Sequence, residues 1–214
     1  MSTNTMSGEA ARAASVRRGR LLEYLTIGWN SLEAIVSIAA GLFAGSIALV
    51  GFGLDSLIEV SSGAALLWRL HTDAPERRER AEQIALKIVG VSFLLLAAYV
   101  AFDSVKSLVK REAPETSYAG IAIAALSLAV MPLLARAKRR VAAEISSRAL
   151  EADSRQTDIC MYLSAIVLGG LALNALFGWW WADPVAALVM IPIIAREGVD
   201  ALRGETCCGE GSCH

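Results

Sequence analysis

Six stretches of the chain are long and apolar enough to cross a lipid bilayer as α-helices. A spanning helix needs roughly 20 mostly apolar residues, and a helix satisfies its own backbone hydrogen bonds inside the hydrocarbon. The predicted spans are residues 21–44, 46–70, 84–108, 118–135, 153–177 and 182–202. Hydrophobic residues form 55% of the 214 residues, more than a soluble domain of this size usually contains. The sequence therefore predicts an all-α integral membrane protein built as a bundle of six transmembrane helices.

Basic residues predict how these spans are oriented. They cluster in residues 1–20, in the segment after the second span and in the segment after the fourth, whereas the other side offers mainly Lys110 and Arg111. The positive-inside rule then places both termini in the cytoplasm. The expected organisation is a cytoplasmic N-terminal tail (1–20), a six-helix transmembrane domain (21–203) and a Cys/His-rich cytoplasmic tail (204–214). The segment "HTDAPERRERAEQ" is expected to be a solvated connector.

The arginine pattern and the absence of a recognisable targeting segment indicate in which membrane such a chain is expected. We expect a multi-pass protein of the plasma (inner) membrane whose main partner is membrane lipid. The formal net charge is −1, so no basic excess suggests binding to nucleic acid.

Two carboxylates lie inside the second apolar span, in "GFGLDSLIEV". Asp55 and Glu59 are four residues apart, so a helix places them on one face. Ionisable groups within spans cost roughly 2.5–3.5 kcal/mol on insertion scales and usually mark a pathway or a site. Two such carboxylates cannot both stay charged in a low dielectric without a cation. The pair therefore predicts a site for a divalent metal ion, for a proton, or for both in turn.

Polar residues of the first and fifth spans are candidates for the same site. Asn30 and Glu33 share a face of the first span, and Gln156 and Cys160 share a face of the fifth. A thiolate added to carboxylates favours zinc, cadmium or similar ions over magnesium and calcium. Other interpretations remain open at this point: Glu33 pairs with an arginine or is protonated, Cys160 is a small buried apolar residue, and Gln156 joins two helices.

The C-terminal segment "ETCCGEGSCH" gathers the other cysteines of the chain. Cys207, Cys208, Cys213 and His214 are expected to contact a soft metal and hand it to the predicted metal site within the spans. The alternative is a disordered tail with incidental thiols.

Three segments resemble the cation diffusion facilitators, a family of transporters of zinc and related metals. "GSIALVGFGLDSLIEVSSG" resembles the second span of that family, "SRALEADSRQTDICMYLSAIVLGGL" the start of the fifth, and "WADPVAALVMIPIIAREGVDALR" the sixth. The resemblance covers roughly residues 20 to 203. The family's second span carries a His/Asp-x-x-x-Asp pair, and Asp55 and Glu59 fall on those positions.

The fifth span departs from the family pattern, which reads Ala-Asp-x-x-His-x-x-x-Asp followed by Ser. Matching the flanking residues places Gln156 at the His position and Cys160 at the Asp position. A second register would place Ser154 and Asp158 there, but it breaks the match at the flanking residues. The resemblance thus implies a mixed site, for which we favour Asp55, Glu59 and Cys160 with Glu33 included, and with Gln156 and Asn30 as further candidates.

The resemblance also implies an activity. It implies a divalent transition-metal transporter, with zinc first and cadmium or cobalt next, that exports its ion by alternating access in exchange for protons, and it implies no enzymatic activity. The family's usual cytoplasmic C-terminal domain is expected to be missing, so a homodimer would form through the transmembrane helices. The alternatives are a membrane metal-binding protein that does not transport, uptake in place of efflux, and a thiol oxidoreductase using Cys207 and Cys208, which lack the Cys-x-x-Cys spacing.

Overall fold

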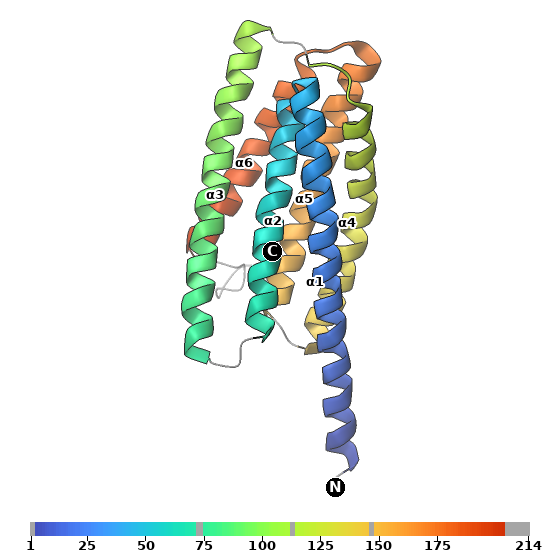
Figure 1. Ribbon diagram of the computed structural model, residues 1–214, viewed down its shortest axis with the longest axis vertical. Helices are drawn as coiled ribbons and strands as arrows, with labels where there is room; N and C mark the ends of the chain where they lie inside the picture. The colour runs from blue at the N-terminus through green and yellow to red at the C-terminus, as the bar shows by residue number, and fades with distance from the viewer. Residues whose placement is uncertain (1–2, 72–74, 112–113, 146–147, 204–214) are drawn as a thin grey trace, which may run out of the picture.

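The computed structural model describes residues 3–71, 75–111, 114–145 and 148–203, which form six α-helices (Figure 1). These are α1 (Thr3–Ala44), α2 (Ile47–His71), α3 (Pro75–Lys110), α4 (Tyr118–Ile145), α5 (Arg148–Phe177) and α6 (Ala182–Arg203). Among the described residues, five segments are long and apolar enough to span a membrane: Ala13–Ala44, Ile47–Ala64, Gly90–Lys110, Tyr118–Ile145 and Asp153–Phe177. The sixth helix, α6, is not among them, because Arg196, Glu197 and Asp200 interrupt its apolar run. The predicted all-α fold of six helices is confirmed.

Several helices continue well past the predicted apolar spans. The segment "HTDAPERRERAEQ" was expected to be a connector, but α3 begins within it, at Pro75. Proline suits the first position of a helix, and the Glu, Arg and Ala residues that follow are good helix formers. In the same way α4 runs to Ile145, and α1 begins at Thr3 and extends beyond the rest of the bundle (Figure 1). Apolar runs mark the part of a helix that lies in hydrocarbon, not the end of the helix.

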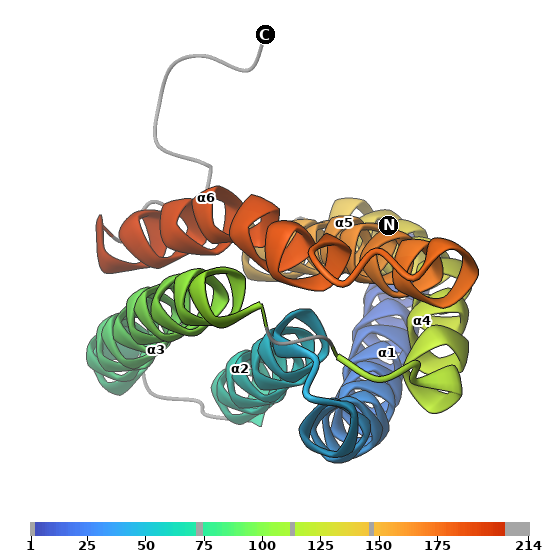
Figure 2. The same cartoon turned by 90° about the horizontal axis from the view of Figure 1, so that it is seen from above.

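The helices form two rows of three. Viewed from above, α2 and α5 lie in the middle, α1 and α4 at one side and α3 and α6 at the other (Figure 2). Phe52 and Val100 are fully buried where α2 meets α3, as are Leu163 and Met190 where α5 meets α6. Four helices, α1, α2, α4 and α5, therefore surround the interior that contains the predicted ligands.

A tight turn at Gly45 joins α1 to α2. Gly45 has a φ of 67°, and the Ser46 N–H donates to the Gly41 carbonyl oxygen at 2.9 Å, which is a glycine C-cap. The carboxylate of Asp183 accepts a hydrogen bond from the Ile47 N–H at 2.9 Å and another from the Ser46 hydroxyl. The start of α6 is therefore tied to the start of α2.

Gly41 allows α1 and α2 to pack closely. A Cβ atom at Gly41 would lie 2.7 Å from Val50 Cγ2 and 2.9 Å from the Val50 backbone nitrogen. On the other helix, a Cβ at Gly53 would lie 2.7 Å from Ile38 Cγ1. Neither position has room for a side chain unless the two helices separate.

We expect Gly41→Leu to destabilise the protein, because α2 cannot move aside without losing its packing. Overpacking of this kind costs about 1–3 kcal/mol or more. The control is Gly28→Leu, since a Cβ at Gly28 in the same helix would meet nothing within 4 Å. Thermal unfolding in detergent should show a lower melting temperature for Gly41→Leu alone. Equal melting temperatures for the two variants would show that the close approach of α1 and α2 does not matter for stability.

Candidate cation-binding site

Glu33 of α1 lies where three helices meet, and its side chain is fully buried. Its Oε1 accepts a hydrogen bond from the Ser56 hydroxyl of α2 at 2.6 Å. Its Oε2 accepts one from the Trp29 indole N–H at 3.1 Å. The Cys160 thiol of α5 donates a hydrogen bond to the same Oε1 atom, with 3.5 Å between sulfur and oxygen. A carboxylate and a thiol from different helices are therefore in direct contact inside the bundle.

The inward position of Glu33 follows from the pattern of α1. Five polar residues of this helix recur at three- and four-residue spacing and are buried: Glu23, Thr26, Asn30, Glu33 and Ser37. Such spacing places side chains on one face of a helix. Large apolar residues occupy the remaining surface of α1 and are exposed: Leu25, Leu32, Ile35, Leu42 and Phe43. The helix is therefore polar toward the bundle and apolar toward lipid.

A second contact joins the first and second helices. The Asn30 side-chain amide donates to the Glu59 carboxylate, and both residues are buried. The Asn30 Oδ1 atom is itself buried and accepts no hydrogen bond from the described residues. The Glu59 carboxylate, for which the sequence indicated no neutralising partner, is therefore hydrogen-bonded to Asn30.

Asp55 lies one turn before Glu59 and is also buried, with an exposed fraction of 3%. Asp55 is close enough to Glu33 for their charges to interact. Asp55, Glu59 and Glu33 are likewise within electrostatic range of the Cys160 thiol. The structure thus brings Asp55, Glu59, Glu33 and Cys160 into one region. With Asn30 they form what we call the carboxylate cluster.

The fifth helix shows which of its residues face this cluster. Gln156 accepts a hydrogen bond from the Ser62 hydroxyl at 3.1 Å, and its Nε2 has no partner among the described residues. Asp158 instead accepts from Arg139 of α4 and is partly exposed. The Ser154 hydroxyl donates to the Glu151 carbonyl oxygen. Of the two registers, Gln156 with Cys160 and Ser154 with Asp158, only the first has a residue that is hydrogen-bonded to Glu33 within the described residues. A role of Cys160 in metal binding remains a prediction.

The carboxylate cluster is not a preformed coordination shell. In the part of the chain that the structure describes, no three His, Cys, Asp or Glu side chains converge closely enough to hold a metal ion. Amide, hydroxyl, indole and thiol donors contact the carboxylates of Glu33 and Glu59 instead. A cation would have to replace some of these donors in order to bind. The predicted tail contacts Cys207, Cys208, Cys213 and His214 lie outside the described residues.

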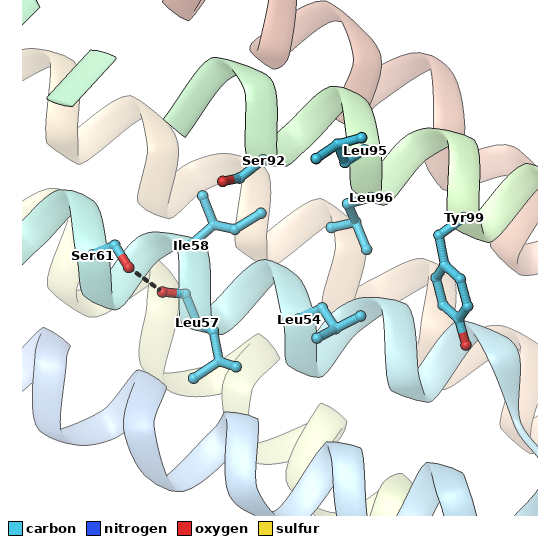
Figure 3. Close-up of a pocket in the computed structure, with 8 residues that line it drawn as sticks. All are labelled: Leu54, Leu57, Ile58, Ser61, Ser92, Leu95, Leu96 and Tyr99. Atoms are coloured by element: carbon cyan, nitrogen blue, oxygen red, sulfur yellow. Dashed lines mark hydrogen bonds between the residues drawn. The ribbon is translucent and has the colours of Figure 1, made fainter. Parts of the chain in front are cut away.

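An open groove lies elsewhere, between α2 and α3, with a volume of about 410 Å³ (Figure 3). Its lining is mainly apolar: Leu54, Leu57, Ile58, Ser61, Ser92, Leu95, Leu96 and Tyr99. None of the predicted ligands lines it. An apolar lining suits hydrocarbon better than a metal ion.

One buried charge was not predicted from the sequence. Lys138 was counted among the basic residues that follow the fourth span, but it is fully buried and contacts Glu23 and Asp153. A signal for this was present in the sequence, because Lys138 continues the helical spacing of the buried face of α4. The buried residues of that face include Ala124, Ser127, Met131, Ala135, Lys138 and Ala142.

Comparison with known proteins identifies the family. Residues 24–205 match the cation efflux transmembrane domain. An uncharacterized transporter of Synechocystis sp. is 25% identical over 196 residues, covering 88% of this chain and 63% of the relative. Transmembrane protein 163 of Xenopus laevis is 30% identical over 182 residues, covering 85% of this chain and 65% of the relative. The cation-efflux pump FieF of Shewanella oneidensis is 29% identical over 113 residues, covering 53% of this chain and 36% of the relative.

The chain spans less than two thirds of the length of each of these curated relatives. The family match covers nearly all of the six-helix bundle, including every member of the carboxylate cluster. Cation efflux proteins transport divalent cations and are not enzymes. The chain therefore belongs to the cation efflux family through its transmembrane domain, as a multi-pass membrane protein.

Proposed function

We propose that this protein transports a divalent transition-metal cation through the carboxylate cluster. The observation that carries the proposal is the contact between the buried Glu33 carboxylate and the Cys160 thiol, 3.5 Å apart on α1 and α5. Buried ionisable groups inside spans usually mark an ion pathway because their burial is costly. The neighbouring acids Asp55 and Glu59 supply the negative charge that a divalent ion requires.

The donor types favour zinc, followed by cadmium and cobalt. Carboxylate oxygens alone suit magnesium or calcium, whereas a thiolate shifts preference toward softer ions. The Cys160 sulfur is the only soft donor in the cluster, so it should set this preference.

Cys160→Ser should lower cadmium flux about tenfold more than cobalt flux, because serine can still donate to Glu33 but offers no soft ligand. Both ions are measured on the same preparation of reconstituted protein, so protein amount and orientation cancel in the ratio. A cadmium-to-cobalt ratio unchanged from the wild type would rule out Cys160 as a ligand.

The proposed cycle is proton-coupled efflux by alternating access from the cytoplasm across the plasma (inner) membrane. Binding of a metal requires deprotonated ligands and so releases protons, and returning protons would displace the ion on the far side. Direction is tested in metal-stressed cells that express either the wild type or Glu33→Gln. Efflux predicts a lower zinc content with the wild type, whereas a higher content would establish uptake.

We further propose a homodimer that forms through the transmembrane helices. The outward side chains of α3 support this, since Leu95, Phe102 and Val109 are all largely exposed and apolar. The apolar groove between α2 and α3 would lie beside that surface (Figure 3). Cross-linking between cysteines introduced at Phe102 should trap the dimer in membranes.

A further inference from the structure

A second buried charged group lies on the same side of the cluster as the N-terminus. It consists of Glu23 of α1, Lys138 of α4 and Asp153 of α5, and we call it the lysine triad. The Lys138 ammonium lies 3.3 Å from each carboxylate oxygen of Glu23 and also donates to Asp153. The side chains of Glu23 and Lys138 are 0% exposed, and that of Asp153 is 11% exposed. The buried Glu23 Oε1 accepts no hydrogen bond from the described residues.

The lysine triad belongs to the same four-helix interior as the carboxylate cluster: its residues lie on α1, α4 and α5, and α2 packs against it. A Cβ atom at Gly63 of α2, one turn after Glu59, would lie 3.5 Å from Glu23 Oε2. Along α1, Asn30 follows Glu23 by two turns, a rise of about 10 Å. Lys138 and Glu59 also act on one another electrostatically.

Two polar atoms without partners among the described residues lie in the carboxylate cluster and on α5 between Asp153 and Cys160. Asn30 Oδ1 and Gln156 Nε2 are both buried and unpaired within the described residues. Gln156 follows Asp153 by three residues on α5, so it extends the triad toward Cys160. Unpaired buried polar atoms are costly and are usually satisfied by water or an ion. They mark a polar route from the triad to the carboxylate cluster.

The charges of the triad explain what occupies it. With both carboxylates ionised, the one ammonium leaves one excess negative charge in the triad, which is expensive in a low dielectric. The lysine ammonium is a compact cation on a flexible stem that can withdraw toward the membrane interface. Lys138 thus occupies the place of a cation between two acids, and its tether allows it to leave.

We propose that Glu23 and Asp153 form a second cation-binding station, occupied by the Lys138 ammonium in this structure, where the incoming divalent cation displaces Lys138 on its way to the carboxylate cluster. The inference rests on the proposed transport function. Two carboxylates hold a partly hydrated divalent ion weakly, which suits a site that an ion must also leave.

The first test measures sided zinc transport by Glu23→Gln in proteoliposomes of known orientation. The half-saturating zinc concentration should rise about tenfold when zinc is offered on the N-terminal side. Loss of a residue that supports a metal site from outside its ligand shell typically weakens metal binding by about that factor. It should stay unchanged when zinc is offered on the other side. Glu144→Gln is the control, because Glu144 is an exposed glutamate that accepts from Ser15.

An equal shift from both sides, or none, would overturn the station and leave the triad as a purely structural ion pair. Absence of flux in the wild type would instead refute the proposed transport, so the two failures are distinguishable.

The second test counts cadmium ions bound to the detergent-purified protein by titration calorimetry. Lys138→Met should bind one more cadmium ion per chain than the wild type, since the tethered competitor is gone. The double variant Glu23→Gln with Lys138→Met has the same formal charge as the wild-type triad and should bind no extra ion. No extra ion in the single variant, or an extra ion retained in the double variant, would overturn the proposal. If Lys138→Met does not fold, the sided zinc measurement decides alone.

Discussion

Glu33→Gln is expected to lower divalent-cation flux by about a hundredfold or more. A unit charge about 4 Å from another contributes about 4 kcal/mol at the effective dielectric of about 20 that describes protein sites, and a divalent ion doubles that. Since 1.4 kcal/mol corresponds to about a factor of ten, loss of this one charge exceeds two orders of magnitude in ion binding. Initial rates of zinc entry into proteoliposomes measure the effect.

The fold should survive this change. Glutamine has the shape of glutamate and still accepts a hydrogen bond, although it cannot satisfy Ser56, Trp29 and Cys160 together. One unsatisfied donor costs about 1–3 kcal/mol, which thermal unfolding will report separately from flux. The control is again Glu144→Gln at the exposed end of α4. More than half of the wild-type flux remaining in Glu33→Gln would remove Glu33 from the pathway.

Asp55→Asn is expected to have the next largest effect, a loss of flux of more than about tenfold. Asp55 is buried and acts electrostatically on both Glu59 and Cys160, so its charge contributes to the same ion site. The control is Asp103→Asn in α3, where the carboxylate pairs with Lys106 at 3.4 Å. Asp103→Asn should transport at close to the wild-type rate.

The two acids should also behave as one unit. If Glu33 and Asp55 share one ion, the double variant Glu33→Gln with Asp55→Asn should be hardly worse than Glu33→Gln alone, because neighbouring sites are not additive. Fully additive losses would show that the two carboxylates serve different steps.

The helices themselves could be predicted because apolar runs report directly on the hydrocarbon. Their ends could not, since charged helix formers continue α3 back to Pro75 and α4 on to Ile145. The tight turn at Gly45 was predictable, because a glycine between two long apolar runs is a local signal.

The candidate site was predictable in its residue types and only partly in its contacts. Periodicity shows that Asn30 and Glu33 share a face, but not that Asn30 meets Glu59 or that Glu33 meets Cys160. Those pairings depend on how helices far apart in sequence pack together. Lys138 was missed because a basic residue after an apolar run indicates a membrane border, whereas the structure places it on the buried face of α4.

The most direct test is zinc flux into proteoliposomes, with and without an imposed pH gradient, for the wild type, Asp55→Ala and Glu33→Gln. Transport through the carboxylate cluster predicts zinc flux in the wild type that increases with the opposing proton gradient and is lost in both variants. Zinc binding by the wild type without any flux would contradict transport and would indicate a metal-binding membrane protein, such as a sensor or a metal-handling partner.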